Sequence, residues 1–73
     1  MPGFAKDIRP LFRNVDIDHM KPQGLDLSSY DDVCNRADDI YDQVSNGFMP
    51  PDQPWSQDLI QLFRDWMDGG MQP

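Results

Sequence analysis

The apolar spacing of residues 56–70 most constrains what this chain can fold into, because it fits an amphipathic helix. Ser56 is a typical N-cap, and a helix from Gln57 to about Asp68 would end at Gly69-Gly70. Its apolar residues recur every three or four positions and form one stripe: Leu59, Leu62, Phe63 and Trp66, extended by Ile60 and Met67. Such a stripe has to be buried against another element, so the sequence predicts a helical core.

A second apolar face lies near the N-terminus. The spacing of Phe4, Ile8, Leu11 and Phe12 predicts a first helix of about three turns. Pro10 has no backbone donor, so we expect a kink there, or a helix that begins late enough to place Pro10 in its first turn. This helix and the closing helix are expected to pack across each other as the main core. The expected contacts between them are Phe12, Phe63 and Trp66.

Two further helices are expected between residues 28 and 46. Ser28 or Ser29 can cap a short helix that runs to about Cys34. A longer helix from about Arg36 to Ser45 follows, before the stop signal Asn46-Gly47. Its apolar stripe consists of Ala37, Ile40, Tyr41 and Val44.

Residues 14–27 are expected to be mostly irregular, with Pro22 and Gly24 as breakers of regular structure. Asp16 and Asp18 alternate with apolar residues, so we expect them to face solvent. The residues expected to turn inward are Val15, Ile17, Met20 and Leu25. The fold class predicted for the chain is therefore all-α: a small bundle of three to five helices that forms a single domain over residues 1–73.

The length of 73 residues is close to the lower limit for a chain that folds alone. Chains of this size usually need a disulfide, a metal, a cofactor or a partner as a supplement. Cys34 is the only cysteine, so an internal disulfide is impossible. The chain is 38% apolar and 11% aromatic, which is too aromatic for a disordered tail.

The charge of the chain bears on its partners. Its formal net charge is −7, and all thirteen acidic residues are Asp. Such a surface repels phosphate backbones, so no nucleic-acid binding is expected. No stretch is apolar for long enough to span a bilayer, and the N-terminus lacks the basic and apolar regions of an export signal. We therefore expect a cytoplasmic protein that is not embedded in a membrane.

Several segments occur in a familiar order. Phe4–Phe12 precedes His19, Leu25–Val33 follows it, Gly47-Phe48-Met49-Pro50-Pro51 comes next, and Ile60–Gly70 closes the chain. In this order they resemble a class I cytochrome c. The resemblance implies that these segments are the helix before the haem-attachment site, the proximal axial histidine, the segment after that site, the loop with the distal axial methionine, and the C-terminal helix.

The chain departs from that family where the chemistry takes place. Asn14-Val15-Asp16-Ile17-Asp18-His19-Met20 stands where the family carries Cys-x-x-Cys-His, and Val15 and Asp18 occupy the two thioether positions. Neither residue can form a thioether bond, and Cys34 lies well beyond this segment. The resemblance therefore implies a cytochrome-c-like bundle without covalent haem.

His19 and Met49 leave three interpretations. They could ligate a noncovalent haem, since His and Met do bind haem iron, although Asp18 would place a charge at the porphyrin edge. They could bind copper, with Met20 as a further ligand, although a lone imidazole makes a poor site. In the third interpretation, which we favour, Met49 fills a gap in the core and His19 is exposed or hydrogen-bonded.

Other candidates for chemistry are weaker. Cys34 has the apolar spacing of a small buried thiol near Tyr30 and Ala37. The alternate carboxylates of Asp16 and Asp18 could bind a divalent cation, but the segment lacks the glycine and the closing glutamate of a calcium loop. The sequence contains no glycine-rich phosphate loop and no evident pairing of a nucleophile with a base, so no enzyme is predicted and no metal is expected.

The function expected is that of an accessory or protein-binding module, for example a small subunit or partner of a larger oxidoreductase. Without haem, apolar surface would remain around the proline-rich loop, and exposed apolar patches mark interfaces. The residues expected to face the partner are Met20, Tyr30, Phe48, Met49, Pro50, Pro51 and Trp55. The competing hypothesis is an electron carrier with noncovalent haem, or copper, on His19 and Met49. The sequence leaves the identity of the partner and the oligomeric state open.

Overall fold

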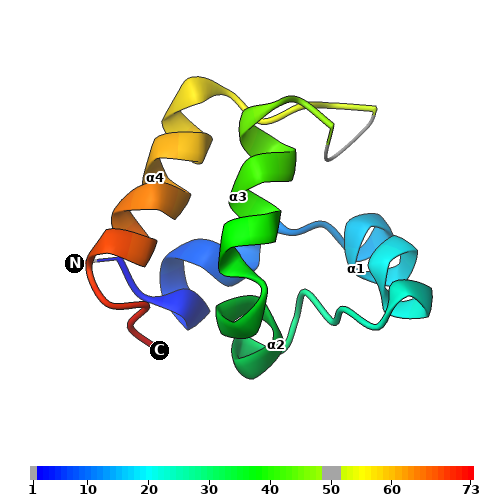
Figure 1. Cartoon of the computed structure of the whole chain (residues 1–73), viewed down its shortest axis with the longest axis horizontal. Coiled ribbons are helices and arrows are strands. Elements are labelled where there is room, and N and C mark those ends of the chain that lie inside the picture. Colours follow the sequence, from blue (N-terminus) through cyan, green and yellow to red (C-terminus); the bar gives the residue numbers. More distant parts are fainter. Residues whose placement is uncertain (1, 49–51) are drawn as a thin grey trace.

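The computed structural model describes residues 2–48 and 52–73. Over these ranges the protein is helical and contains no β-strand, apart from a single bridge between Gly3 and Gln72. The predicted all-α class is therefore confirmed (Figure 1). In chain order the elements are η1 (Phe4–Ile8), η2 (Arg9–Leu11), α1 (Asn14–Met20), η3 (Lys21–Gln23), α2 (Tyr30–Asn35), α3 (Ala37–Ser45) and α4 (Gln57–Asp68).

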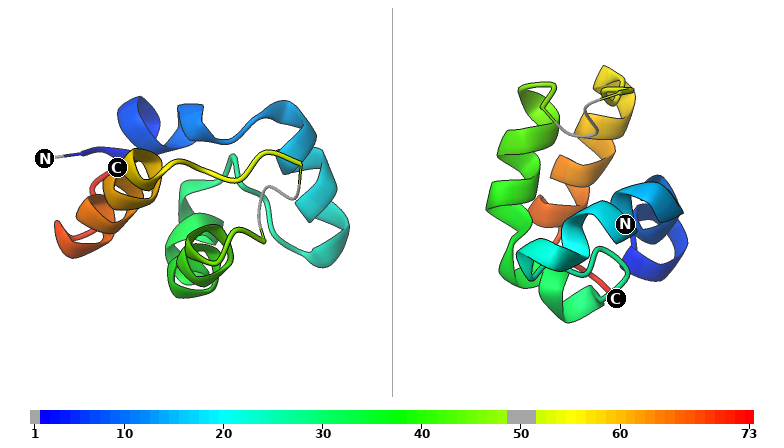
Figure 2. Two further views of the ribbon diagram at one scale, coloured as in Figure 1. Left: turned by 90° about the horizontal axis from the view of Figure 1, so that it is seen from above. Right: turned by 90° about the vertical axis from the view of Figure 1, so that its right-hand side faces the viewer.

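Helices α3 and α4 lie side by side and run in opposite directions (Figure 1; Figure 2, right). Both have the bounds that the sequence predicts to within one residue. The Ser56 hydroxyl accepts the backbone N–H of Leu59 and so caps α4, while Gly47, at φ 77°, follows the end of α3. Their buried faces consist of Ala37, Ile40 and Val44 on α3 and of Ile60, Phe63 and Trp66 on α4.

The N-terminal segment is helical but not a regular α-helix. It begins as one π-helical turn, η1, and continues as a 3₁₀ turn, η2, with Pro10 at its start. Because Pro10 cannot donate to the carbonyl of Lys6, the α-helical ladder is interrupted there and the pitch of the chain changes. The expected disturbance at Pro10 is thus observed, and it divides the predicted helix into two short pieces.

The first segment packs on the last helix through aromatic rings. The ring of Phe4 lies 6.0 Å from that of Trp66, centroid to centroid. Phe12 lies 5.7 Å from Trp55, which in turn lies 6.1 Å from Phe63. The N- and C-terminal helical segments therefore meet as predicted, and the Trp55 ring bridges Phe12 and Phe63.

The prediction of irregular chain over residues 14–27 is wrong for its first half, where α1 forms. The Asp16 carboxylate accepts the backbone N–H of Arg13 at 3.3 Å, which satisfies one free donor at the start of the helix, and it also accepts from the Arg13 guanidinium. This Arg-x-x-Asp pair differs from the Ser or Thr pattern that usually signals a helix start. Pro22 and Gly24 do end the regular structure as expected, and Gly24 has φ 83°.

Helix formation also reverses two predicted orientations. Val15, expected to turn inward, is 61% exposed, whereas Asp16, expected in solvent, is 8% exposed. An α-helix turns about 100° per residue, so the alternation read from the sequence does not apply here. Ile17 and Leu25 are buried and Asp18 is exposed, in agreement with the sequence.

The two ends of the chain are joined by backbone and side-chain hydrogen bonds. The backbone N–H of Phe4 and the Trp66 indole Nε1–H both donate to the Gln72 carbonyl, at 2.8 Å each. The Tyr30 hydroxyl donates to the neighbouring Met71 carbonyl. The C-terminal segment is thus held against the N-terminal segment, as Figure 1 shows. Every helix within the described ranges falls short of the length and apolar character that crossing a bilayer requires.

Candidate functional site

A cavity of about 470 Å³ opens between α3 and the segment formed by α1 and η3. Figure 1 shows α1 standing to one side of the α3–α4 pair. The residues that line the cavity are His19, Met20, Gln23, Leu25, Arg36, Asp39, Ile40, Gln43 and Phe48.

Helix α3 contributes one wall of this cavity. Arg36, just before α3, together with Asp39, Ile40 and Gln43, follows the i, i+3, i+4, i+7 spacing of one helix face. Ile40 is 2% exposed and belongs to the core, while the three polar residues are exposed beside it. The wall therefore has an apolar base and a polar rim.

The opposite wall comes from the end of α1 and the turn after it. His19 is exposed, Met20 is half-buried against the core, and the Gln23 side-chain amide donates to the Met20 sulfur at 3.9 Å. Gly24 takes a left-handed conformation, which turns the chain so that Leu25 returns to the core. The histidine is thus placed at the rim, beside a methionine that packs on the interior.

Phe48 supplies exposed apolar surface at the cavity. Its side chain is 68% exposed, and its backbone N–H donates to the Gln43 carbonyl at 2.9 Å, which places it directly after α3. Val15 is also large, apolar and exposed, but it does not line the cavity. Phe48 therefore combines exposure with a position next to a concave surface.

The charged groups of the cavity wall have no ionic partner within the part of the chain that the structure describes. The ion pairs found there involve Arg13 and Arg64, and none involves Arg36 or Asp39. Both side chains are therefore available for a charge brought by another molecule.

A second, smaller cavity of about 310 Å³ lies at the start of α4. Trp55 is half-buried there, and its indole ring packs against the rings of Phe12 and Phe63. The residues that line this cavity are Leu11, Arg13, Gln53, Pro54, Trp55, Ser56 and Leu59. Trp55 therefore lies at a different concave surface from Phe48.

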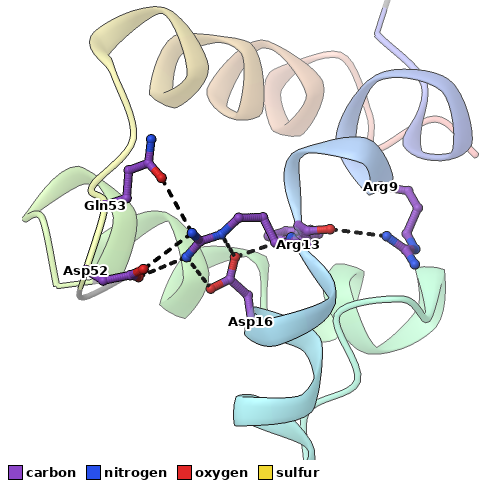
Figure 3. A network of polar contacts seen from close by, with 6 residues as sticks. Arg9, Arg13, Asp16, Asp52 and Gln53 are labelled. Carbon is purple, nitrogen blue, oxygen red and sulfur yellow. Dashed lines mark hydrogen bonds and ion pairs between the residues drawn. The ribbon is translucent and has the colours of Figure 1, made fainter.

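A polar network centred on Arg13 was not predicted from the sequence (Figure 3). Its guanidinium binds Asp16 through Nε–Oδ2 at 2.9 Å and Nη2–Oδ1 at 3.0 Å, and it binds Asp52 through Nη2–Oδ1 at 2.9 Å. The hydrogen bond to Arg13 is the main cause that lowers the pKa of Asp52, and the two carboxylates raise the pKa of Arg13. Arg13 thereby ties the segment after α3 to the start of α1.

Tyr30 has a mainly structural environment. It is half-buried, its ring packs edge-on against Phe4 at 5.5 Å, and its hydroxyl donates to the Met71 carbonyl. The adjacent Cys34 side chain is the largest cause that raises the pKa of Tyr30. Cys34 itself is half-buried, so the predicted small thiol against the core is present but partly accessible.

The structure brings together three of the residues singled out from the sequence. His19, Met20 and Phe48 line the first cavity, whereas Tyr30 and Trp55 do not. Met49, Pro50 and Pro51 lie outside the described residues. Leu25 and Ile40 were predicted as inward-facing residues but not as part of a site, and the lining residues that sequence reasoning missed are Gln23, Arg36, Asp39 and Gln43. For those near α3 a signal was present, since Arg36, Asp39 and Gln43 flank the apolar stripe at helical spacing.

Within residues 2–48 and 52–73, no group of three or more His, Cys, Asp or Glu side chains is placed to hold a metal ion. Two of the three ligands considered for haem or copper, His19 and Met20, line the first cavity, and the third, Met49, lies outside the described residues. Comparisons with protein-family models, with curated proteins and with solved structures found no match to this chain.

Proposed function

We propose that this chain is a non-catalytic protein-binding module, a haem-less cytochrome-c-like accessory protein, which binds a larger partner at the cavity between α1 and α3. The observation that carries the proposal is the position of Phe48, an aromatic side chain that is 68% exposed at the edge of a concave surface. A larger oxidoreductase is the partner class that the resemblance to a cytochrome c suggests.

The apolar groups around the cavity support binding rather than simple solvation. Met20, Leu25 and Ile40 give it an apolar base beside the exposed Phe48 ring. Covering an exposed Phe side chain contributes about 2 kcal/mol of transfer free energy. Aromatic residues and methionine are enriched in the cores of protein interfaces.

A matched pair of variants tests this proposal. Phe48→Ser removes the aromatic ring at the cavity, and Val15→Ser removes a similarly exposed apolar side chain outside it. The full chain is first used to capture proteins from its native cells, and the captured proteins are identified and purified. Calorimetry then measures the affinity of each purified protein for the unsubstituted chain and for each variant. We expect Phe48→Ser to weaken direct binding about tenfold or more, and Val15→Ser to leave it nearly unchanged. Equal effects of the two substitutions, or a chain that binds no protein directly, would contradict the proposal.

A second candidate function is electron transfer with a noncovalent haem, and one observation favours it: His19 lines the cavity and has Met20 beside it. The fit is partial. The base formed by Leu25 and Ile40 is apolar, but the α3 wall carries exposed charged groups, which a porphyrin face would have to cover.

An absorption spectrum separates the two candidates. Protein purified from haem-replete cells is compared with its His19→Ala variant. A Soret band that this substitution abolishes would favour the electron carrier over the accessory module. If the spectrum shows aromatic absorbance alone, elemental analysis for copper tests the remaining version of the carrier hypothesis.

A further inference from the structure

We infer that the cavity between α1 and α3 takes a basic segment of the partner, which inserts one apolar side chain beside Phe48 and places its cations along α3. This inference rests on the proposed function and deepens it by stating the chemistry of the partner.

Arg36 and Asp39 line the cavity and their formal charges cancel, so the excess negative charge comes from the rest of α3. Residues 37–45, which form this helix, contain three Asp and no Lys or Arg. Asp38, Asp39 and Asp42 are exposed on α3, and no ion pair within the described ranges involves them. The whole chain has a formal net charge of −7, so its long-range field also attracts cations.

The α1 side carries no opposing excess of charge. Asp18 and Lys21 are both exposed near His19, and their formal charges cancel. Arg36 is the cation on the α3 wall, at its start, whereas Asp39 lies about one turn further along. A basic segment would therefore avoid Arg36 and run toward Asp39 and Asp42.

The shape of the cavity accounts for the apolar part of the ligand. Its base is formed by Leu25 and Ile40, both nearly fully buried, and Phe48 stands at its edge. One apolar side chain of the partner would cover these groups, while flanking Lys or Arg residues reach the carboxylates. Apolar anchors at the centre and charges at the rim are the usual division of roles in protein interfaces.

The test uses a library of random short peptides selected on the immobilised full chain, with counter-selection on the Phe48→Ser variant. We expect the selected peptides to place Lys or Arg close to one Leu, Met, Phe or Trp. Their affinity, measured by calorimetry, is expected to fall when the salt concentration rises from about 0.15 M to about 1 M, because the Debye length shortens from about 8 Å to about 3 Å.

Charge variants then locate the interaction. Asp39→Asn is expected to weaken binding of a selected peptide about two- to fivefold, as the loss of an exposed ion pair does. Arg36→Gln is expected to strengthen binding, because it removes a like charge from the wall. Asp65→Asn, a change at another exposed carboxylate, on α4 and outside the cavity, serves as the matched control. Thermal denaturation checks that each variant folds, and Asp42→Asn replaces Asp39→Asn if that variant does not.

Two contrary results have different meanings. Selected peptides that are acidic or uncharged, or weaker binding after Arg36→Gln, would overturn the inferred charge of the partner and leave the proposed function standing. A selection in which no peptide distinguishes the chain from its Phe48→Ser variant would overturn both.

Discussion

Arg13 and Asp52 lie 39 positions apart in the sequence, yet Nη2 of the arginine is 2.9 Å from Oδ1 of the aspartate (Figure 3). The same guanidinium binds Asp16, a carboxylate that is 8% exposed. The Arg13 guanidinium therefore pairs both with a buried carboxylate at the start of α1 and with an exposed carboxylate in the segment before α4. Fork-like pairing of this kind fixes geometry as well as charge.

Arg13→Met is expected to lower the thermal midpoint clearly. The substitution leaves the Asp16 carboxylate in a mostly buried position without its charged partner, which is the costly way to break an ion pair. Arg64→Met is the control, because its pair with Asp68 is largely exposed on both sides and is expected to matter little. Thermal unfolding followed by circular dichroism compares the two variants, and equal shifts would contradict this role of Arg13.

The stability of the chain is expected to fall in acid partly through Asp52. The Arg13 side chain lowers the pKa of Asp52 below its ordinary value of 3.8 in the folded state. A lowered folded-state pKa gives stability that is complete above 3.8 and is lost as the pH falls through the folded value. Urea unfolding at about pH 6 and about pH 3 measures this loss, which is expected to be smaller in Asp52→Asn. If Asp52→Asn lost as much unfolding free energy between these two pH values as the unsubstituted chain does, Asp52 would be excluded as a source of the acid sensitivity.

Trp66→Phe is expected to destabilise the chain by about 1–3 kcal/mol. Trp66 is fully buried, and the substitution removes its hydrogen bond to the Gln72 carbonyl as well as part of its ring. Equilibrium unfolding in urea gives the free energy. Phe63→Leu, a substitution in the same helix and core that removes no hydrogen bond, is the comparison. Resistance of the C-terminal residues to carboxypeptidase is expected to fall in Trp66→Phe and to change little in Phe63→Leu.

Phe48→Ser and Val15→Ser are each expected to change the free energy of unfolding by no more than about 0.5 kcal/mol. Both side chains are mostly exposed, so little buried area is lost in either variant. Urea unfolding measures both values. A large loss of stability in Phe48→Ser alone would mean that this ring belongs to the fold, and the binding comparison would then have to use the conservative variant Phe48→Leu.

The helices with strong local signals were predicted well. For α4, the Ser56 cap, the apolar stripe and the closing glycines all indicate one element, and the structure has it from Gln57 to Asp68. Helix α2 likewise begins after Ser29, whose hydroxyl accepts the backbone N–H of Asp32. Caps and periodicity act within one or two turns of chain, so the sequence contains them directly.

Helix α1 and the cavity beside it were not predicted, because they depend on partners outside the local sequence. The segment has a weak apolar stripe, and its start depends on an Arg13–Asp16 pair that Asp52 joins from across the molecule. The cavity lining likewise combines His19 and Met20 with a wall of α3. The sequence singled out the first two residues and Phe48, and it missed Asp39 and its neighbours.

The sequence by itself determined the helical class, the bounds of α2, α3 and α4, and the presence of a single cysteine, Cys34. Only the tertiary structure decided that Asp16 is buried, that Val15 is exposed, and that Phe48 stands beside a cavity. The physical reason is range: hydrogen bonds and apolar spacing within a helix act over a few residues, whereas burial and concave surfaces arise when distant segments pack together.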